Sequence, residues 1–275
     1  MEIRNPVHPQ DFKLYTTEKI RQEFLIQRLF TPGETRLVYS HFDRMIVGGA
    51  CPDKDLKLEA SKEIGASFFL ERREMGIVNV GPRGTVSVGG EKYVLETRDG
   101  LYVGMGSKEI IFSSDDPLHP ARFYLNSSPA HAKYPTLKIG LKDAEKTHLG
   151  SPSESNVRTI NKYIHPNGAK SCQLVMGMTL LEPGSVWNSM PCHTHERRME
   201  VYFYSNLPDN AVVFHLMGEP EETRHIVVRN EEAVISPSWS IHSGVGTSHY
   251  AFIWGMIGEN QTFTDMDAVA MGRLR

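Results

Sequence analysis

Two short segments of this chain carry four side chains that could bind one metal ion. His193, His195 and Glu200 form the pattern His-x-His-x4-Glu, and His242 ends the segment 237–242, Pro-Ser-Trp-Ser-Ile-His. Imidazoles and a carboxylate suit a divalent transition metal such as zinc, manganese, iron or nickel. Four thiolates would indicate structural zinc, whereas three nitrogen donors and one oxygen donor favour a site with a position open for water or substrate.

The spacing of these ligands predicts β-strands. Residues two apart in a strand point to the same face, so His193 and His195 would both face the metal. In a helix the same two side chains would point about 200° apart. Glu200 is at an odd spacing from His195, so a bulge or short turn must precede the next strand, for which residues 201–204 are suitably β-branched and aromatic. His242 can join only if the chain folds back, a ligand layout typical of a cupin barrel.

Other interpretations of the same residues are weaker. A lone histidine is more often an ordinary core or surface residue, but four candidate ligands at this spacing favour a metal site. A zinc-protease helix would need a histidine where Met199 stands, so the His-Glu-x-x-His motif is absent. On a strand Cys192 faces away from His193, and we expect it to pack in the interior.

The composition describes a soluble globular protein. The chain has 275 residues, 40% of them hydrophobic and 23% charged, with a formal charge of −3, which gives no bias toward nucleic acid or an anionic membrane. No stretch approaches the roughly 20 apolar residues that span a bilayer, and the first residues contain no apolar signal segment. The three cysteines lack Cys-x-x-Cys spacing and are predicted to be free thiols. We therefore expect a cytoplasmic protein.

The order of predicted elements indicates a mainly β fold. Residues 17–26 have a threonine cap candidate and helical apolar spacing, whereas short β-like runs separated by Gly, Pro and Asn follow residue 33. A polar stretch over about 130–167 looks like a connection between halves. We predict a bicupin of two jelly-roll β-barrels after a short N-terminal helical segment, with residues 1–150 as the N-terminal barrel and 151–275 as the C-terminal barrel.

An internal similarity indicates that only the second barrel binds metal. Residues 68–74 align with 193–199 at an offset of 125 and share Glu-Arg-Arg, and with a gap residues 104–109 align with 237–242. In this alignment Phe68, Leu70 and Glu109 occupy the places of His193, His195 and His242. The first half is therefore predicted to be a duplicated barrel without a metal site.

Charged and aromatic residues suggest the kind of substrate. The candidate substrate-binding residues are Arg197, Arg198, Arg224 and Trp239, and the candidate catalytic residues are Tyr202, Lys162 and His165. Arginine binds carboxylates through two hydrogen bonds, and a metal with an open position polarises a carbonyl. Each candidate also has an ordinary structural interpretation, as a solvated arginine or a barrel-filling tyrosine. The predicted substrate is a small anionic carbonyl compound.

Several segments resemble the 5-keto-4-deoxyuronate isomerase family over essentially the whole chain. The similar segments are 40–49, 69–74, 159–163, 190–204 and 233–246. The resemblance implies a two-barrel cupin with one Zn²⁺ per subunit at His193, His195, Glu200 and His242, assembled as a homohexamer in the cytoplasm of a pectin-degrading bacterium. Members of this family convert 5-keto-4-deoxyuronate into 3-deoxy-D-glycero-2,5-hexodiulosonate, an aldose to ketose isomerisation of an acidic ketosugar.

Two other functions fit the same ligands. A cupin dioxygenase also uses three histidines and one glutamate, in that case with iron and dioxygen. A non-catalytic, sugar-acid-binding cupin would bind the substrate without turnover. No helix-turn-helix or basic recognition segment is visible, so we expect no nucleic-acid partner.

Overall fold

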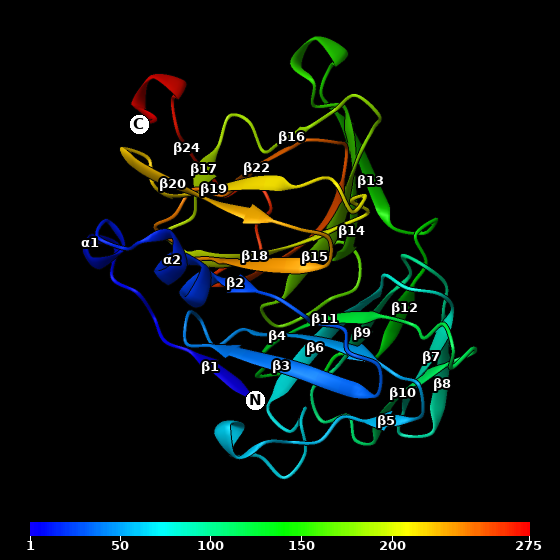
Figure 1. Cartoon of the computed structure of the whole chain (residues 1–275). Helices are drawn as coiled ribbons and strands as arrows, with labels where there is room; N and C mark the ends of the chain where they lie inside the picture. Colours follow the sequence, from blue (N-terminus) through cyan, green and yellow to red (C-terminus); the bar gives the residue numbers. More distant parts are fainter. The chain divides into compact units, whose positions relative to one another are not determined.

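β-strands dominate the computed structural model, which describes residues 1–275 (Figure 1). The chain divides into two units. The first unit comprises Met1–Arg4, Arg28–Glu145 and Lys162–Met176, and the second comprises Asn5–Gln27, Lys146–Asn161 and Gly177–Arg275. None of the helices is long and apolar enough to cross a lipid bilayer.

The first unit is built on two sheets. The larger one contains, in spatial order, β1 (Glu2–Arg4), β3 (Glu34–Ser40), β4 (Ile46–Cys51), β11 (Phe123–Pro129), β6 (Arg73–Asn79), β9 (Gly100–Val103) and β12 (Leu137–Ile139). The smaller one contains β5 (Leu56–Lys57), β10 (Ile110–Ser114), β7 (Gly84–Val88) and β8 (Glu91–Leu95). In the larger sheet β1 and β3 are parallel, and every other neighbouring pair is antiparallel.

The strands of the second unit repeat this plan. A seven-stranded sheet contains β13 (Glu145–Leu149), β14 (Arg158–Ile164), β15 (Val175–Leu181), β23 (Ala251–Gly258), β18 (Arg198–Ser205), β21 (Glu232–Ser236) and β2 (Leu25–Ile26). A four-stranded sheet contains β16 (Trp187–Asn188), β22 (Ser243–Gly246), β19 (Val213–Glu219) and β20 (Glu222–Val228). A two-stranded ribbon pairs β17 (His193–Thr194) with β24 (Asp267–Ala268).

The sheet orders confirm the predicted bicupin plan. The order β3-β4-β11-β6-β9 recurs as β14-β15-β23-β18-β21, and β5-β10-β7-β8 recurs as β16-β22-β19-β20. The register agrees with the internal alignment, because Met75 opposes Val103 between β6 and β9 as Glu200 opposes Ser236 between β18 and β21. Each predicted barrel consists of two sheets with open ends, a jelly roll rather than a closed cylinder of hydrogen-bonded strands.

The units are not separated at residue 150, where the sequence predicted the boundary. Residues 5–27 belong to the second unit because β2 adds a strand beside β21, with Leu25 opposite Val234. Residues 162–176 belong to the first unit, where the buried Glu74 carboxylate accepts hydrogen bonds from the backbone N–H groups of residues 172–174. Long-range pairing, which the order of elements does not specify, decides both assignments.

The N-terminal helical segment covers part of the second unit. Helices α1 (Pro9–Phe12) and α2 (Thr17–Phe24) lie beside β19, β20 and β21 (Figure 1). The Thr16 hydroxyl caps α2 by accepting from the Lys19 backbone N–H, and Ile20 and Phe24 are its buried face. The predicted helix over 17–26 ends two residues early, because residues 25 and 26 are extended and form β2. Three 3₁₀ turns, Lys62–Ile64, Pro152–Glu154 and Met271–Arg273, complete the helical elements.

Apolar side chains fill the place in the first unit that corresponds to the metal ligands of the second. Leu70 and Met75, which align with His195 and Glu200, are both 0% exposed and belong to the hydrophobic core of the unit. Fully burying a side chain of this size contributes about 1.5–3 kcal/mol to folding. The first unit therefore uses this position for packing, and the group of candidate metal ligands lies in the second unit.

Candidate metal centre

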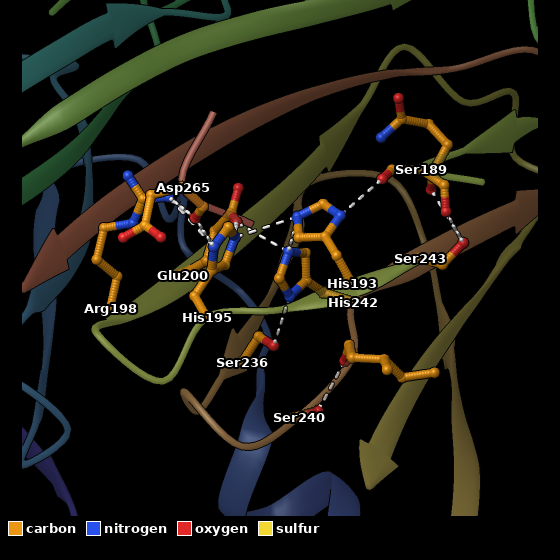
Figure 2. Close-up of polar contacts among 12 residues, drawn as sticks. Ser189, His193, His195, Arg198, Glu200, Ser236, Ser240, His242, Ser243 and Asp265 are labelled. Atoms are coloured by element: carbon orange, nitrogen blue, oxygen red, sulfur yellow. Dashed lines mark hydrogen bonds and ion pairs between the residues drawn. The ribbon is translucent and has the colours of Figure 1, made fainter. Parts of the chain in front are cut away.

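The structure brings together the four predicted ligands. His193 lies on β17, His195 follows it, Glu200 lies on β18, and His242 directly precedes β22. Their ligand atoms all lie within 4.8 Å of one another, and the side chains converge in Figure 2. We call these four residues the His3Glu cluster. The odd spacing between His195 and Glu200 predicted a turn, and the structure contains it. The Arg198 backbone N–H donates to the carbonyl oxygen of His195 at 3.0 Å.

The distances within the His3Glu cluster fit one shared ion. The Nε2 atom of His193 lies 3.1 Å from that of His195 and 3.0 Å from that of His242. The Oε2 atom of Glu200 lies 3.0 Å from His242 Nε2 and 3.3 Å from His195 Nε2. Atoms bound to one ion at about 2.0–2.2 Å, and close to right angles, are separated by about 3 Å. The donor set therefore fits a divalent transition metal.

Hydrogen bonds at the other ring nitrogen orient the imidazoles. His195 Nδ1 lies 2.9 Å from the backbone carbonyl oxygen of Asp265, which can only accept, so Nδ1 carries the proton and Nε2 keeps its lone pair for a metal. The other two imidazoles have serine partners, Ser189 Oγ at 3.4 Å from His193 Nδ1 and Ser236 Oγ at 3.3 Å from His242 Nδ1 (Figure 2). All three rings are thus held with Nε2 toward the centre.

The local electrostatics favour the ligand form of the side chains. Burial lowers the pKa of His193 to about 2, with help from the neighbouring imidazoles of His242 and His195, so the ring is neutral at neutral pH. Burial alone would raise the pKa of Glu200, but its close contacts with the His242 and His195 rings outweigh this effect and hold the pKa well below its usual range. A neutral imidazole and an ionised carboxylate are the forms that bind a metal without first losing a proton.

A cavity of about 350 Å³ opens onto the His3Glu cluster. Three of the four ligands line it, all except His242. Its apolar wall includes Ile160, Phe252, Trp254, Met256, Phe263 and Met266, and its other polar residues are Arg158, Thr179, Asn188, Ser189 and Tyr202. A cavity of this size takes a small molecule, and a mostly apolar wall with a few polar groups is usual for such sites.

Tyr202 is the one predicted catalytic candidate that lines this cavity. It lies two residues beyond Glu200 on β18, so the two side chains share a face of the sheet, as predicted. Burial, together with the nearby Glu200 carboxylate, raises the pKa of its hydroxyl well above 10. At neutral pH the hydroxyl keeps its proton, and Tyr202 can therefore donate a hydrogen bond to a bound oxygen but is a poor general base.

The other two catalytic candidates, Lys162 and His165, lie elsewhere. Both line a separate cavity of about 300 Å³ within the first unit. Lys162 Nζ is 2.6 Å from the Glu145 Oε1 atom, and His165 Nδ1 is 3.7 Å from Oε2 of the same carboxylate. They belong to the stretch over about 130–167 that looked like a connection between halves, but the structure places them on and just after β14.

The predicted substrate-binding arginines contact the protein itself. Arg198 is 1% exposed and donates to the backbone carbonyl oxygens of Thr262 and Asp265, each at 2.7 Å. Arg197, on the outer side, pairs with Asp265 and Asp267 at 2.8 and 2.9 Å. Arg198 holds the backbone of the segment that carries Asp265 beside the His3Glu cluster, and Arg197 pairs with side chains on the outer side of the same segment. Neither lines the cavity. Both guanidinium groups bond instead to residues 262–267, although the buried Nε atom of Arg198 has no hydrogen-bond partner.

Arg224 and Trp239 also lie away from the cavity. Arg224 pairs with Glu222 at 2.7 Å and donates to the Lys13 carbonyl oxygen at 3.0 Å. The Trp239 ring packs against Phe12 and Phe24 of the N-terminal helices, with centroid separations of 5.3 and 6.5 Å. All four substrate-binding residues were predicted because they lie near the ligands in sequence. None of them lines the cavity, because segments distant in sequence pack against them.

Sequence reasoning missed Arg158, which does line the cavity. It lies on β14, inside the stretch that was predicted to be a connection, and Ile160 lies two residues further along the same wall. The available signal was the β-like alternation of residues 158–164, which contains several residues suited to a strand. Cys192 is buried and packs with Ile241 and Val269, which confirms the predicted packing role.

Comparison with known proteins identifies the family. Residues 24–271 match the KduI/IolB family. A protein from Caldicellulosiruptor bescii, named 4-deoxy-L-threo-5-hexosulose-uronate ketol-isomerase, is 62% identical over 276 residues, and one of the same name from Escherichia coli O127:H6 is 55% identical over 278 residues; in both pairs the match covers 100% of each chain.

Solved structures of low sequence identity share the fold. An IolB-like protein from Salmonella typhimurium LT2 has a TM-score of 0.67 and 13% identity, with 82% of this chain and 86% of that chain covered. The oxalate decarboxylase of Lactobacillus farciminis has a TM-score of 0.58 and 8% identity, with 87% and 84% covered. Since the match to the family model and the identity to full-length relatives agree, this chain belongs to the KduI/IolB family.

Proposed function

We propose that this protein is a zinc-dependent ketol-isomerase that converts 4-deoxy-L-threo-5-hexosulose uronate, or 5-keto-4-deoxyuronate, into 3-deoxy-D-glycero-2,5-hexodiulosonate. Full-length relatives that are 55–62% identical carry this ketol-isomerase name. The observation that supports the reaction best is that the His3Glu cluster opens onto a cavity of about 350 Å³ with a largely apolar wall. Such a site binds one small molecule with its reacting atoms beside the ligands.

The reaction needs no co-reactant. One hydrogen moves from C2 to C1, so the C1 aldehyde is reduced to an alcohol while the C2 alcohol is oxidised to a ketone. His193, His195, Glu200 and His242 would hold the metal ion. A bound divalent ion supplies Lewis-acid polarisation of carbonyl and hydroxyl oxygens.

The protein residues contribute orientation and exclusion of water. Tyr202 faces the cavity beside Glu200 with its proton retained, and is placed to donate a hydrogen bond to a substrate oxygen. The apolar side chains of Phe252 and Trp254 form part of the wall. A water-poor site strengthens such hydrogen bonds and limits side reactions of the reactive dicarbonyl.

The test is turnover under anaerobic conditions in D2O. Purified, zinc-loaded protein is incubated with the ketouronate produced by a polyuronate lyase, and the products are followed by NMR. We expect the 2,5-diketo acid to form without dioxygen. Deuterium at the carbon that was C1 of the substrate, the CH2OH carbon of the product, would identify proton transfer through an enediol, whereas a hydride shift leaves that carbon without deuterium. His195→Ala is the matched variant, expected to lose bound metal and activity while keeping the far-ultraviolet circular dichroism of the wild type.

Two results would replace this proposal. A requirement for ferrous iron and dioxygen would indicate a cupin dioxygenase. Tight binding of the ketouronate by metal-loaded protein without any ketose formed would indicate a non-catalytic sugar-acid-binding protein. Metal analysis of the protein as purified, by mass spectrometry, tests zinc against iron, manganese and nickel.

The assembly and location that we propose are based on the family resemblance. We expect a homohexamer with one Zn²⁺ per subunit, acting in the cytoplasm during pectin degradation. Light scattering coupled to size-exclusion chromatography measures the assembly, and a mass corresponding to fewer or more subunits would contradict the hexamer.

A further inference from the structure

Arg158 is the single arginine or lysine among the residues that line the metal cavity. The other charged lining groups are members of the His3Glu cluster, and Arg197 and Arg198, close in sequence to the cluster, lie outside the cavity and bond to Asp265, Asp267 and backbone carbonyls. Arg158 therefore supplies the permanent positive charge of the cavity wall.

The guanidinium group of Arg158 is only partly satisfied by the protein. Its Nη1 atom donates to the backbone carbonyl oxygen of Asn156 at 2.9 Å. Its Nε atom is buried and has no hydrogen-bond partner. No carboxylate forms an ion pair with it, in contrast to Arg197 and Arg224. A partly buried cation with an unused donor is costly unless an anionic ligand completes it.

The side that remains is suited to a carboxylate. With Nη1 used by Asn156, Nη2 is left for a carboxylate oxygen. The Nε atom beside it is buried and also lacks a partner, so a small shift of the side chain would let Nε and Nη2 bind both oxygens of a carboxylate. The position of the Asn156 carbonyl is itself fixed, because the side-chain oxygen of Asn156 accepts from the Ser151 backbone N–H at 2.9 Å. The arginine is thus held in place before any ligand binds.

The location fits the far end of an acidic sugar chain. Arg158 and Tyr202 line one cavity, and the positive charge of Arg158 acts on the Tyr202 hydroxyl. Ile160 and Trp254 contribute apolar surface to the same wall, against which a deoxygenated CH2 carbon loses no hydrogen bonds. A six-carbon chain has its aldehyde at one end and its carboxylate at the other, so the two ends need different partners.

We infer that Arg158 binds the substrate carboxylate and so fixes which end of the chain faces the His3Glu cluster, making it the residue that selects uronates over neutral sugars. This inference rests on the proposed isomerase function. It assigns to β14 a role that the sequence had suggested for Arg197, Arg198 and Arg224.

The experiment compares Arg158→Met with Arg224→Met, which removes one positive charge from a partly exposed position outside the cavity. The probes are gluconate and its neutral amide, gluconamide, titrated calorimetrically into zinc-loaded protein. Wild type and Arg224→Met should bind gluconate about tenfold to a hundredfold more tightly than gluconamide, the usual effect of hydrogen bonds to a charged group. Arg158→Met should bind both weakly and equally.

Steady-state kinetics with the ketouronate give a second measurement. Arg158→Met should raise KM by a similar factor with a smaller effect on kcat, and Arg158→Lys, which keeps the charge but not the paired donors, should be intermediate. Retention of the acid preference in Arg158→Met, or an equal loss in Arg224→Met, would overturn the inference. If wild type shows the Arg158-dependent preference but forms no ketose, the proposed function fails and the carboxylate subsite stands. If ketose forms and Arg158→Met leaves KM unchanged, the proposed function stands and the carboxylate subsite fails.

Discussion

The buried guanidinium group of Arg198 donates a hydrogen bond of 2.7 Å to the backbone carbonyl oxygen of Asp265 (Figure 2). The same oxygen lies 2.9 Å from His195 Nδ1. The Asp265 carbonyl oxygen therefore connects the buried Arg198 side chain with the His195 ring, whose Nε2 faces the other members of the His3Glu cluster. Arg198 is a positioning residue for the His3Glu cluster.

Replacing Arg198 with Met should weaken metal binding by about tenfold to a hundredfold, the usual effect of losing a partner that orients a ligand. Zinc affinity is measured by competition with a chromogenic chelator. Arg197→Met, at the 36% exposed side chain next to it, is the matched control and should change zinc affinity by less than about threefold. Equal affinities in wild type and Arg198→Met would show that Asp265 orients His195 without the arginine.

Tyr202→Phe should lower kcat by about a hundredfold or more, because the proposed role of the hydroxyl that lines the cavity is to donate a hydrogen bond to a substrate oxygen, and Tyr202 is not one of the His3Glu cluster. Zinc content and the thermal unfolding midpoint should stay close to those of the wild type. Tyr204→Phe is the control on the same strand: its hydroxyl bonds the buried His215 ring at 2.8 Å, so this variant should lose stability instead of kcat. An unchanged kcat in Tyr202→Phe would remove the tyrosine from the reaction.

Removal of the metal should destabilise the protein. An ion that binds the native state at 100 times its Kd adds about 2.7 kcal/mol to the free energy of unfolding. Treatment with a chelator should therefore lower the unfolding midpoint measured by scanning calorimetry, and added zinc should restore it. The variant His242→Ala should not respond to zinc, whereas a variant of the corresponding residue of the first unit, Glu109→Ala, should respond as the wild type does.

Glu74 should be important for stability and not for metal binding. Its carboxylate is 0% exposed and accepts hydrogen bonds from the Tyr102 and Ser128 hydroxyls and from the backbone N–H groups of residues 172–174. Glu74→Ala leaves these donors buried without an acceptor and should cost about 3 kcal/mol or more. Chemical denaturation measures the loss, and zinc affinity of the folded fraction should be unchanged. Glu71→Ala, at a partly exposed side chain, is the control and should change stability by less than about 1 kcal/mol.

The sequence alone was sufficient to predict which side chains form the candidate metal centre and the general plan of the fold. Few side chains bind metals, and the two-residue period of a strand fixes which of them share a face, so the roles of His193 and His195 follow from local geometry. The internal alignment predicted that Leu70 belongs to a unit without a metal site. Leu70 lies in the hydrophobic core of the first unit, and the repeated sheet order agrees with the duplication.

The tertiary structure decided which charges face the cavity and which segments belong together. Arg197 and Arg198 are close to the ligands in sequence, but the segment around Asp265, which is far along the chain, folds onto them and bonds to their guanidinium groups. Arg158 reaches the cavity from β14, in a stretch whose polar composition resembled a connection. Strand pairing between residues distant in sequence also moved residues 5–27 into the second unit. Local spacing determines the face of the strand to which a side chain points. The charged groups that it contacts there depend on which distant segment packs against that face.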